Sequence, residues 1–105
     1  MTAFRLSPEA DADVDDILDY TRDVWGREQA SAYVRGLYDM FDEIASRRRP
    51  WKRADLGTED VLFRRHYGAY WIYWRETEGG MCAIVGILHE RMDMSARMAV
   101  RLRVP

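Results

Sequence analysis

The stretch from Val61 to Asp93 constrains this chain most, because it is dense in residues that favour β-strands. Glycines at Gly68 and at Gly79 and Gly80 supply the positive φ angles that hairpin turns need. The pattern predicts three antiparallel strands, over Val61–His66, Ala69–Glu76 and Met81–His89. The last of them is apolar on both faces, which is typical of an interior strand.

Alternation along these strands predicts two apolar faces. In the middle strand it groups Trp71, Tyr73 and Arg75 against Tyr70, Ile72 and Trp74. In the last strand it groups Ala83, Val85 and Ile87 against Cys82, Ile84 and Leu88. One layer of helices covers one face only, so we expect the other to stay uncovered. A contiguous uncovered aromatic face is abnormal for a monomer and indicates a protein partner.

The residues upstream predict the covering layer. Phe4–Leu6 suits an edge strand, and Ser7 followed by Pro8 is typical of a helix start. The first helix should end at Gly26, with Val14, Ile17, Leu18, Thr21 and Trp25 forming its apolar stripe and Asp13 on its solvated side. A second helix is predicted over Glu28–Ser46, ended by Pro50, and a surface loop over Trp51–Asp60.

Length and composition predict one soluble domain over residues 1–105. The N-terminus lacks the apolar stretch of a secretion signal, no run approaches membrane-spanning length, and the lone Cys82 forms no internal disulfide, so we expect a cytoplasmic protein. Cys82 is interpreted as a small buried hydrophobe rather than as a nucleophile.

The formal net charge of −2 conceals an asymmetry. Residues 1–46 carry 11 acidic and 4 basic side chains, a net charge of −7, whereas residues 47–105 carry 7 acidic and 12 basic ones, a net charge of +5. Five of the seven residues from Arg47 to Arg53 are basic, which is compatible with a solvated helix end or with an anchor for phosphate or an acidic partner. Trp51 beside them is interpreted mainly as a cap on the core.

The charged residues of the strand block raise the question of an enzymatic function, and one chemistry to test against them is metal-free cleavage of RNA. That reaction needs a base, an acid and cations for the phosphorane charge. The candidates for that chemistry are Arg64, Arg65, His66, Arg75, His89, Glu90 and Arg91. A histidine that closes an apolar strand is more often structural than catalytic, so the ribonuclease interpretation is the weaker one. With two histidines and one cysteine at no paired spacing, we expect no metal site and no cofactor.

Two segments carry a family resemblance, FRLSPEADADVDDILDYTRDVWGREQASAY near the start and above all GILHERMDMSARM near the end. Together with the strand block they resemble the ParE toxins of the RelE/ParE superfamily, over nearly the whole chain. The resemblance implies an α+β fold of order β-α-α-β-β-β with the helix hairpin on one face of an antiparallel sheet. It also implies a bacterial type II toxin that inhibits DNA gyrase without catalysis, and that a ParD-like antitoxin holds inactive in a hetero-oligomer. DNA would then be contacted only through the antitoxin.

Two sets of site residues follow from these interpretations. For the antitoxin contact we expect Trp71 and Tyr73 on the uncovered face, with Arg75, Arg64 and Arg65 beside them. For the gyrase contact we expect the charged, methionine-rich C-terminal segment, with Arg91, Met92, Met94, Arg97 and Arg101. This segment is predicted to form a short basic amphipathic helix or a partly ordered tail. The alternatives are a RelE-like ribosome-dependent ribonuclease and a non-toxic interaction domain.

Overall fold

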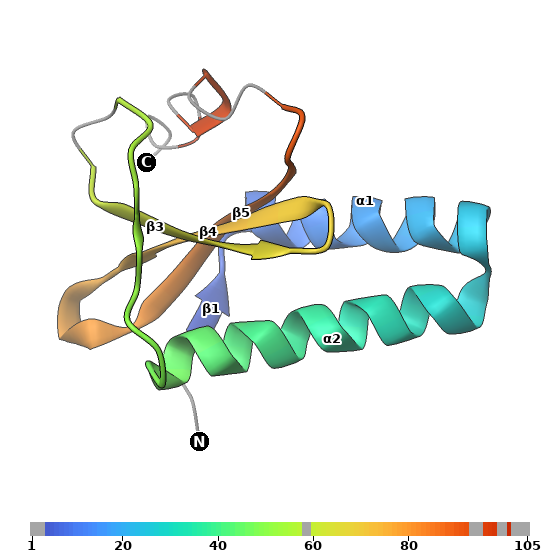
Figure 1. The fold of residues 1–105 in the computed structure, drawn as a ribbon, viewed down its shortest axis with the longest axis horizontal. Helices are drawn as coiled ribbons and strands as arrows, with labels where there is room; N and C mark the ends of the chain where they lie inside the picture. The colour runs from blue at the N-terminus through green and yellow to red at the C-terminus, as the bar shows by residue number, and fades with distance from the viewer. Residues whose placement is uncertain (1–3, 58–59, 93–95, 99–100, 102–105) are drawn as a thin grey trace.

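The computed structural model describes residues 4–57, 60–92, 96–98 and 101, and Figure 1 shows two layers, a hairpin of long helices and a twisted sheet. The elements are β1 (Phe4–Leu6), α1 (Pro8–Trp25), α2 (Arg27–Ser46), β2 (Arg53–Ala54), β3 (Leu62–Tyr67), β4 (Tyr70–Glu76), a 3-10 turn η1 (Glu78–Gly80) and β5 (Cys82–His89). The strand order is β1-β5-β4-β3-β2, with β1 parallel to β5 and the other neighbours antiparallel. The predicted order of helices and long strands is confirmed, and none of the described helices is long and apolar enough to cross a bilayer.

The helix hairpin follows from local sequence. The Ser7 hydroxyl accepts a hydrogen bond from the Ala10 backbone N–H at 3.1 Å, and Pro8 occupies the first helical turn. Gly26 has a φ of 95°, so it ends α1 and α2 begins at the next residue, Arg27. The second helix therefore starts one residue earlier than predicted.

The helix hairpin covers one sheet face with a buried cluster. Its members are Ala10, Val14, Ile17, Leu37, Phe41, Ile44, Ile72, Trp74, Cys82, Ile84 and Ile87. Burying one such large apolar side chain contributes about 1.5–3 kcal/mol. Trp25 was expected in this layer, but it is 64% exposed because the tip of the hairpin extends beyond the sheet (Figure 1).

The segment predicted as a loop contains a short strand. Arg53 and Ala54 pair antiparallel with Phe63 and Leu62, so β2 forms the edge of the sheet opposite β1. Trp51 just before it packs against the core, and its indole Nε1–H donates to the Ile44 carbonyl oxygen at 2.9 Å. The interpretation of Trp51 as a cap on the core is confirmed.

A β-bulge interrupts the pairing of β4 with β5. Tyr73 lies opposite Gly86, but the next residue, Trp74, lies opposite Ile84. Val85 is therefore an extra residue in β5, and a bulge of this kind shifts the alternation of side chains beyond it.

The bulge reverses the faces of the last β5 residues. Ile87 joins the cluster under the helices, and Leu88 lies in a second cluster on the other face. The prediction from strict alternation, which placed each on the opposite face, is wrong at these two positions. Nothing in the local sequence except Gly86 marks the bulge.

The second sheet face is also closed, which corrects the central expectation from sequence. Tyr73 is fully buried there, in a cluster with Ala54, Leu62, Val85, Leu88 and Met98. Met98 belongs to the helical C-terminal residues 96–98 and 101 (red in Figure 1). The chain therefore covers this face with its own C-terminal segment, so an uncovered aromatic face no longer argues for a partner.

Asp13 of α1 holds the C-terminal segment in place. Its Oδ1 accepts from Arg101 Nη2 at 2.9 Å, and its Oδ2 accepts from Arg101 Nη1 at 2.6 Å and from the Ile87 backbone N–H at 2.9 Å. Arg101 Nη1 also donates to the Val85 carbonyl oxygen at 3.1 Å. The prediction of a solvated Asp13 is wrong, because this side chain is 12% exposed and satisfies the backbone beside the bulge.

The hydrogen bond to Asp13 raises the pKa of Arg101, against the opposing effect of burial. The guanidinium therefore stays charged in the folded protein. Gly86 leaves room for this arrangement, because a Cβ there would lie 2.7 Å from the Met98 methyl and 2.8 Å from Arg101 Nη1.

We predict that Asp13→Ala and Arg101→Ala each lower the free energy of unfolding by about 1.5–3 kcal/mol, since each removes charge-assisted hydrogen bonds from a half-buried site. The double variant should lose less than the sum, with a coupling energy of about 1–2 kcal/mol. Urea denaturation of the four proteins measures this cycle. Asp16→Ala, at an exposed position on the same helix, is the control and should change stability by less than about 0.5 kcal/mol. Additive losses would contradict the assigned ion pair.

Candidate functional site

Among the described residues, two surface clefts contain side chains that could contact a partner. We call the first the basic cleft, because cationic side chains dominate it. It has a volume of about 430 Å³ and is lined by Arg49, Pro50, Lys52, Arg64, Arg65, His66 and Trp71. It lies next to the start of β2 at Arg53. Beyond Phe63, the edge of β3 that faces β2 makes only one described backbone bond, from the Arg64 N–H to the Lys52 carbonyl oxygen at 3.1 Å.

Positive charge in the basic cleft is only partly compensated. Glu43 Oε1 of α2 lies 3.0 Å from Arg49 Nη2 and 3.8 Å from Arg65 Nη1, so one carboxylate pairs with two guanidinium groups. Burial and the neighbouring Arg49 lower the pKa of Arg65, and Glu43 opposes that shift. Lys52 and Arg64 make no ion pair with any carboxylate among the described residues. The cleft therefore carries a net positive potential.

Trp71 forms one wall of the basic cleft. The Arg64 guanidinium carbon lies 4.0 Å from the centre of its ring, a cation–π contact, and the His66 ring lies edge-on at 4.6 Å. His66 Nε2 lies 2.8 Å from Glu90 Oε2 at the end of β5. The contacts pre-position Arg64 and His66 toward the cleft.

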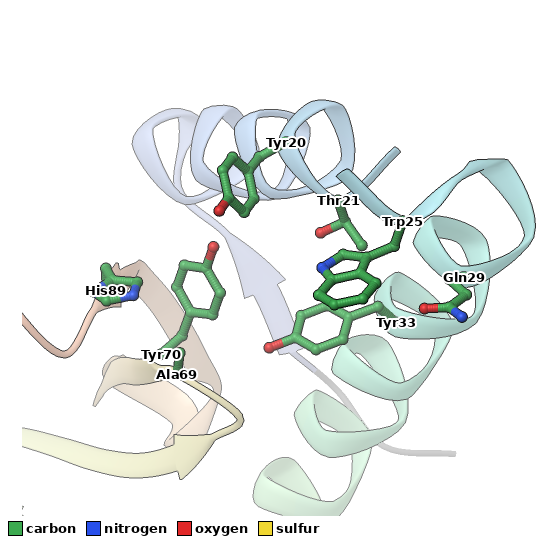
Figure 2. A pocket seen from close by; sticks show the side chains of 8 residues that line it. All are labelled: Tyr20, Thr21, Trp25, Gln29, Tyr33, Ala69, Tyr70 and His89. Carbon is green, nitrogen blue, oxygen red and sulfur yellow. The ribbon is translucent and has the colours of Figure 1, made fainter. Parts of the chain in front are cut away.

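We call the second the aromatic cleft, and Figure 2 shows it from close by. It has a volume of about 560 Å³ and is lined by Tyr20, Thr21, Trp25, Gln29, Tyr33, Ala69, Tyr70 and His89. It opens between the projecting helix tip and the β3–β4 turn. Tyr20 and Tyr70 approach from opposite sides with their hydroxyls toward one another (Figure 2), and Trp25 and Tyr33 line the same cleft.

The phenols of the aromatic cleft are hard to ionise. Burial, with the neighbouring Tyr67 and Tyr70, raises the pKa of Tyr33 to about 12. Burial and Tyr20 raise the pKa of Tyr70. These hydroxyls therefore stay neutral at physiological pH, and the cleft offers flat apolar rings with hydrogen-bonding tips.

The residues predicted for antitoxin binding are divided by the structure. Trp71, Arg64 and Arg65 meet at the basic cleft, and Arg75 is exposed near the far end of β4. Tyr73 is not a surface residue, because the C-terminal segment covers the face on which it lies. Within the described part of the chain, no hydrogen bond, ion pair or ring contact links the Arg75 side chain to the basic cleft.

The residues predicted for gyrase binding also differ in exposure. Arg91, Met92 and Arg97 are exposed, and Met92 retains 40% of its accessible surface. Arg101 is turned inward to Asp13, so it serves as an anchor in the folded chain. Met94 lies outside the described residues.

The candidates for RNA cleavage are divided between two places. Arg64, Arg65 and His66 meet at the basic cleft, and Glu90 Oε2 lies 2.8 Å from His66 Nε2. His89 instead lines the aromatic cleft, where its ring packs edge-on against Tyr70 and its Nδ1 accepts from the Arg91 N–H at 3.2 Å. The interpretation of His89 as structural is consistent with these contacts. Among the described residues, no three His, Cys, Asp or Glu side chains are grouped to hold a metal ion.

Cys82 is buried, as predicted. Burial raises the pKa of its thiol to about 12, although the Arg47 charge opposes the rise. A thiol with this pKa is almost wholly protonated near neutral pH and is a poor nucleophile.

Sequence reasoning missed the aromatic cleft as a site. Tyr20 and Trp25 come from α1, Tyr33 from α2 and Tyr70 from β4, so no short segment contains the constellation. One signal in the sequence could have indicated this cleft. Trp25 directly precedes Gly26, and a large aromatic side chain at the end of a helix has few neighbours to pack against, so it is a candidate for an exposed binding surface.

The fold defines a class of protein. A solved chain titled "Chromosomal ParDE TA system from P. aeruginosa" superposes with a TM-score of 0.68, covering 85% of this chain and 96% of that one. The two share 16% sequence identity, so the likeness is one of fold alone: a helix hairpin on a mixed sheet.

Sequence comparison identifies the family. Residues 4–94 match the family model described as "ParE toxin of type II toxin-antitoxin system, parDE". Toxin ParE of Escherichia coli is 34% identical over 104 residues, which cover 98% of this chain and 99% of the relative. Toxin ParE1 of Caulobacter vibrioides is 32% identical over 103 residues, covering 93% and 99%. The chain belongs to the ParE toxin family of type II toxin–antitoxin systems.

The closed second face generates a prediction about two tyrosines. The Tyr73 hydroxyl is buried without a hydrogen-bond partner that satisfies distance and angle, although nearby Arg64 opposes the rise that burial causes in its pKa. Tyr73→Phe should therefore leave stability unchanged or raise the free energy of unfolding by about 1 kcal/mol. Tyr67→Phe is the matched variant, because its hydroxyl donates to the Tyr33 carbonyl at 2.8 Å. It should lower the free energy of unfolding by about 1 kcal/mol. Denaturant titration measures both, and a loss for Tyr73→Phe as large as that for Tyr67→Phe would show that the Tyr73 hydroxyl is paired.

Proposed function

We propose that this toxin inhibits DNA gyrase by binding it, without catalysing a reaction, and that a ParD-like antitoxin neutralises it by direct contact. The observation that carries the proposal is the match of residues 4–94 to the ParE family. The fold relative comes from a system whose title names ParDE. The proposal places the protein in the bacterial cytoplasm, where gyrase acts, and leaves DNA contact to the antitoxin.

Inhibition by binding requires a surface that recognises one state of the target better than its other states. Arg91, Met92 and Arg97 are the exposed members of the predicted gyrase contact, with Met94 assigned to it from sequence. Arg101 contributes indirectly, because its ion pair with Asp13 anchors the described residues 96–98 and 101, which include Arg97, to α1. A side chain whose backbone is already positioned loses less conformational entropy on binding.

The antitoxin contact is proposed around Trp71, with Arg64, Arg65 and Arg75. Trp71 is half-buried and held by Arg64 and His66, so it offers a pre-organised aromatic surface of the kind that dominates binding energy. Tyr73 joins this contact only if the antitoxin displaces the C-terminal segment above it.

We predict that Arg91→Ala/Arg97→Ala weakens gyrase inhibition by about tenfold or more, which is about 1.4 kcal/mol of lost binding. The measurement is the toxin concentration that halves the supercoiling of a relaxed plasmid. Arg22→Ala/Arg35→Ala, which removes two exposed arginines from the helices, is the control and should retain inhibition. Unchanged inhibition by a folded Arg91→Ala/Arg97→Ala protein would contradict the assigned surface. Absence of any inhibition by the wild-type chain, with mRNA cleavage on ribosomes instead, would contradict the proposed target.

We predict that Trp71→Ala raises the dissociation constant for the cognate antitoxin by about tenfold or more, as expected for an aromatic anchor. Calorimetric titration measures this change. Trp25→Ala is the matched control, because Trp25 is a tryptophan exposed in the other cleft. The reverse pattern, with a loss at Trp25 and none at Trp71, would move the antitoxin to the aromatic cleft.

A further inference from the structure

The basic cleft has features that binding of an antitoxin or of gyrase does not require. We propose that it binds the phosphate group of a nucleotide or of single-stranded nucleic acid, with Arg49, Lys52 and Arg64 as the phosphate ligands and Trp71 and His66 beside the base. The inference goes beyond the proposed function and does not depend on it.

The cations reach the cleft from separate parts of the chain. Arg49 and Lys52 belong to the segment after α2, and Arg64 belongs to β3. The backbone bond from Arg64 to the Lys52 carbonyl, at 3.1 Å, fixes the two segments against each other. Donors that approach from two sides match a phosphate, whose oxygens point in several directions, better than a planar carboxylate.

Charge balance favours an anion in the cleft. Four cationic side chains line it, and Glu43 is the carboxylate that contacts two of them. The other nearby carboxylate, Glu90, is bound to His66. Arg49 and Arg65 lie 3.0 and 3.8 Å from Glu43 Oε1, and burial and the nearby like charge of Arg49 lower the pKa of Arg65. A bound phosphate would offset this positive charge.

The wall of the cleft suits an aromatic base. Arg64 is stacked on Trp71, and the His66 ring stands edge-on to the same indole. Bases stack on guanidinium planes and on aromatic side chains with little dependence on sequence. Trp71 and the Arg64 guanidinium on it thus offer a stacking surface for a base, which a site for a simple anion lacks.

Size and charge restrict the ligand class. A cleft of about 430 Å³ is of the size that small-molecule sites have, and a nucleotide unit is of that size. The acidic residues of α1, which give residues 1–46 a net charge of −7, limit the extent of the positive surface. Extended duplex DNA is therefore the less favoured ligand.

The test uses the full chain without antitoxin or gyrase, so its result is separate from that of the proposed function. The probes are inorganic phosphate, adenosine monophosphate and a single-stranded oligothymidylate of about eight nucleotides, within the usual range of single-strand sites. Quenching of tryptophan fluorescence and calorimetry report binding over a series of salt concentrations. We expect saturable binding of the nucleotide and the oligonucleotide, with inorganic phosphate as a competitor. Tighter binding of the oligonucleotide identifies a nucleic-acid backbone as the source of the phosphate, and equal binding identifies a free nucleotide.

Lys52→Gln/Arg64→Gln should weaken oligonucleotide binding by about tenfold and reduce the slope of log K against log salt by about 1.4, at about 0.7 for each phosphate contact on a single strand. Arg49→Gln/Lys52→Gln, which leaves the Arg64–Trp71 stack intact, is the second variant and should show a similar loss. Arg22→Gln/Arg35→Gln removes the same formal charge away from the cleft and should bind as the wild type does. Absence of saturable binding by the nucleotide and the oligonucleotide, or equal binding by all variants, would overturn the proposal.

Discussion

The carboxylate of Asp13 joins three parts of the chain that are far apart in sequence. It lies on α1, accepts the Ile87 N–H of β5 and pairs with Arg101 of the C-terminal segment. The strand β1 pairs with β5 only as far as Ile84, so without Asp13 the Ile87 N–H would be a buried donor with no acceptor, which costs about 1–3 kcal/mol. One side chain therefore accepts a hydrogen bond from this N–H and, through Arg101, holds Met98 over the second sheet face.

That interaction determines which surfaces remain for partners. Because the C-terminal segment closes the face that contains Tyr73, the accessible features lie at the margins of the sheet. The aromatic cleft opens where the helix tip projects past the strands, and the basic cleft opens where β2 stops pairing with β3. The aromatic cleft exists because the helices are longer than the strands they cover, and the basic cleft exists because β2 is shorter than β3. The charge asymmetry of the sequence contributes to the difference between them, with basic residues after α2 and on β3 and acidic ones on α1.

Part of the candidate site followed from sequence. The basic residues around Arg49 and the pair Arg64 and Trp71 were singled out separately, one as an anchor for phosphate or an acidic partner and the other as an antitoxin contact. Their meeting in one cleft depends on how the segment after α2 runs beside β3, and residue periodicity contains no information on that. The aromatic cleft was missed for the same reason, since its rings come from both helices and β4.

The sequence alone determined the helix hairpin, because the Ser7 and Gly26 caps and the periodicity of apolar residues define both helices. It also determined the three long strands and placed the aromatic residues of β4 in the middle one, because strand propensity is local. Its resemblance to ParE toxins, carried by segments at both ends of the chain, indicated the family that the comparisons establish. Only the tertiary structure decided the bulge, the direction of Leu88, the burial of Tyr73 and the role of Asp13. Each of these depends on a contact between residues distant in the chain. The role of Asp13 cannot be predicted from its position on the helix, because the Ile87 N–H from which it accepts a hydrogen bond reaches it only in the folded protein.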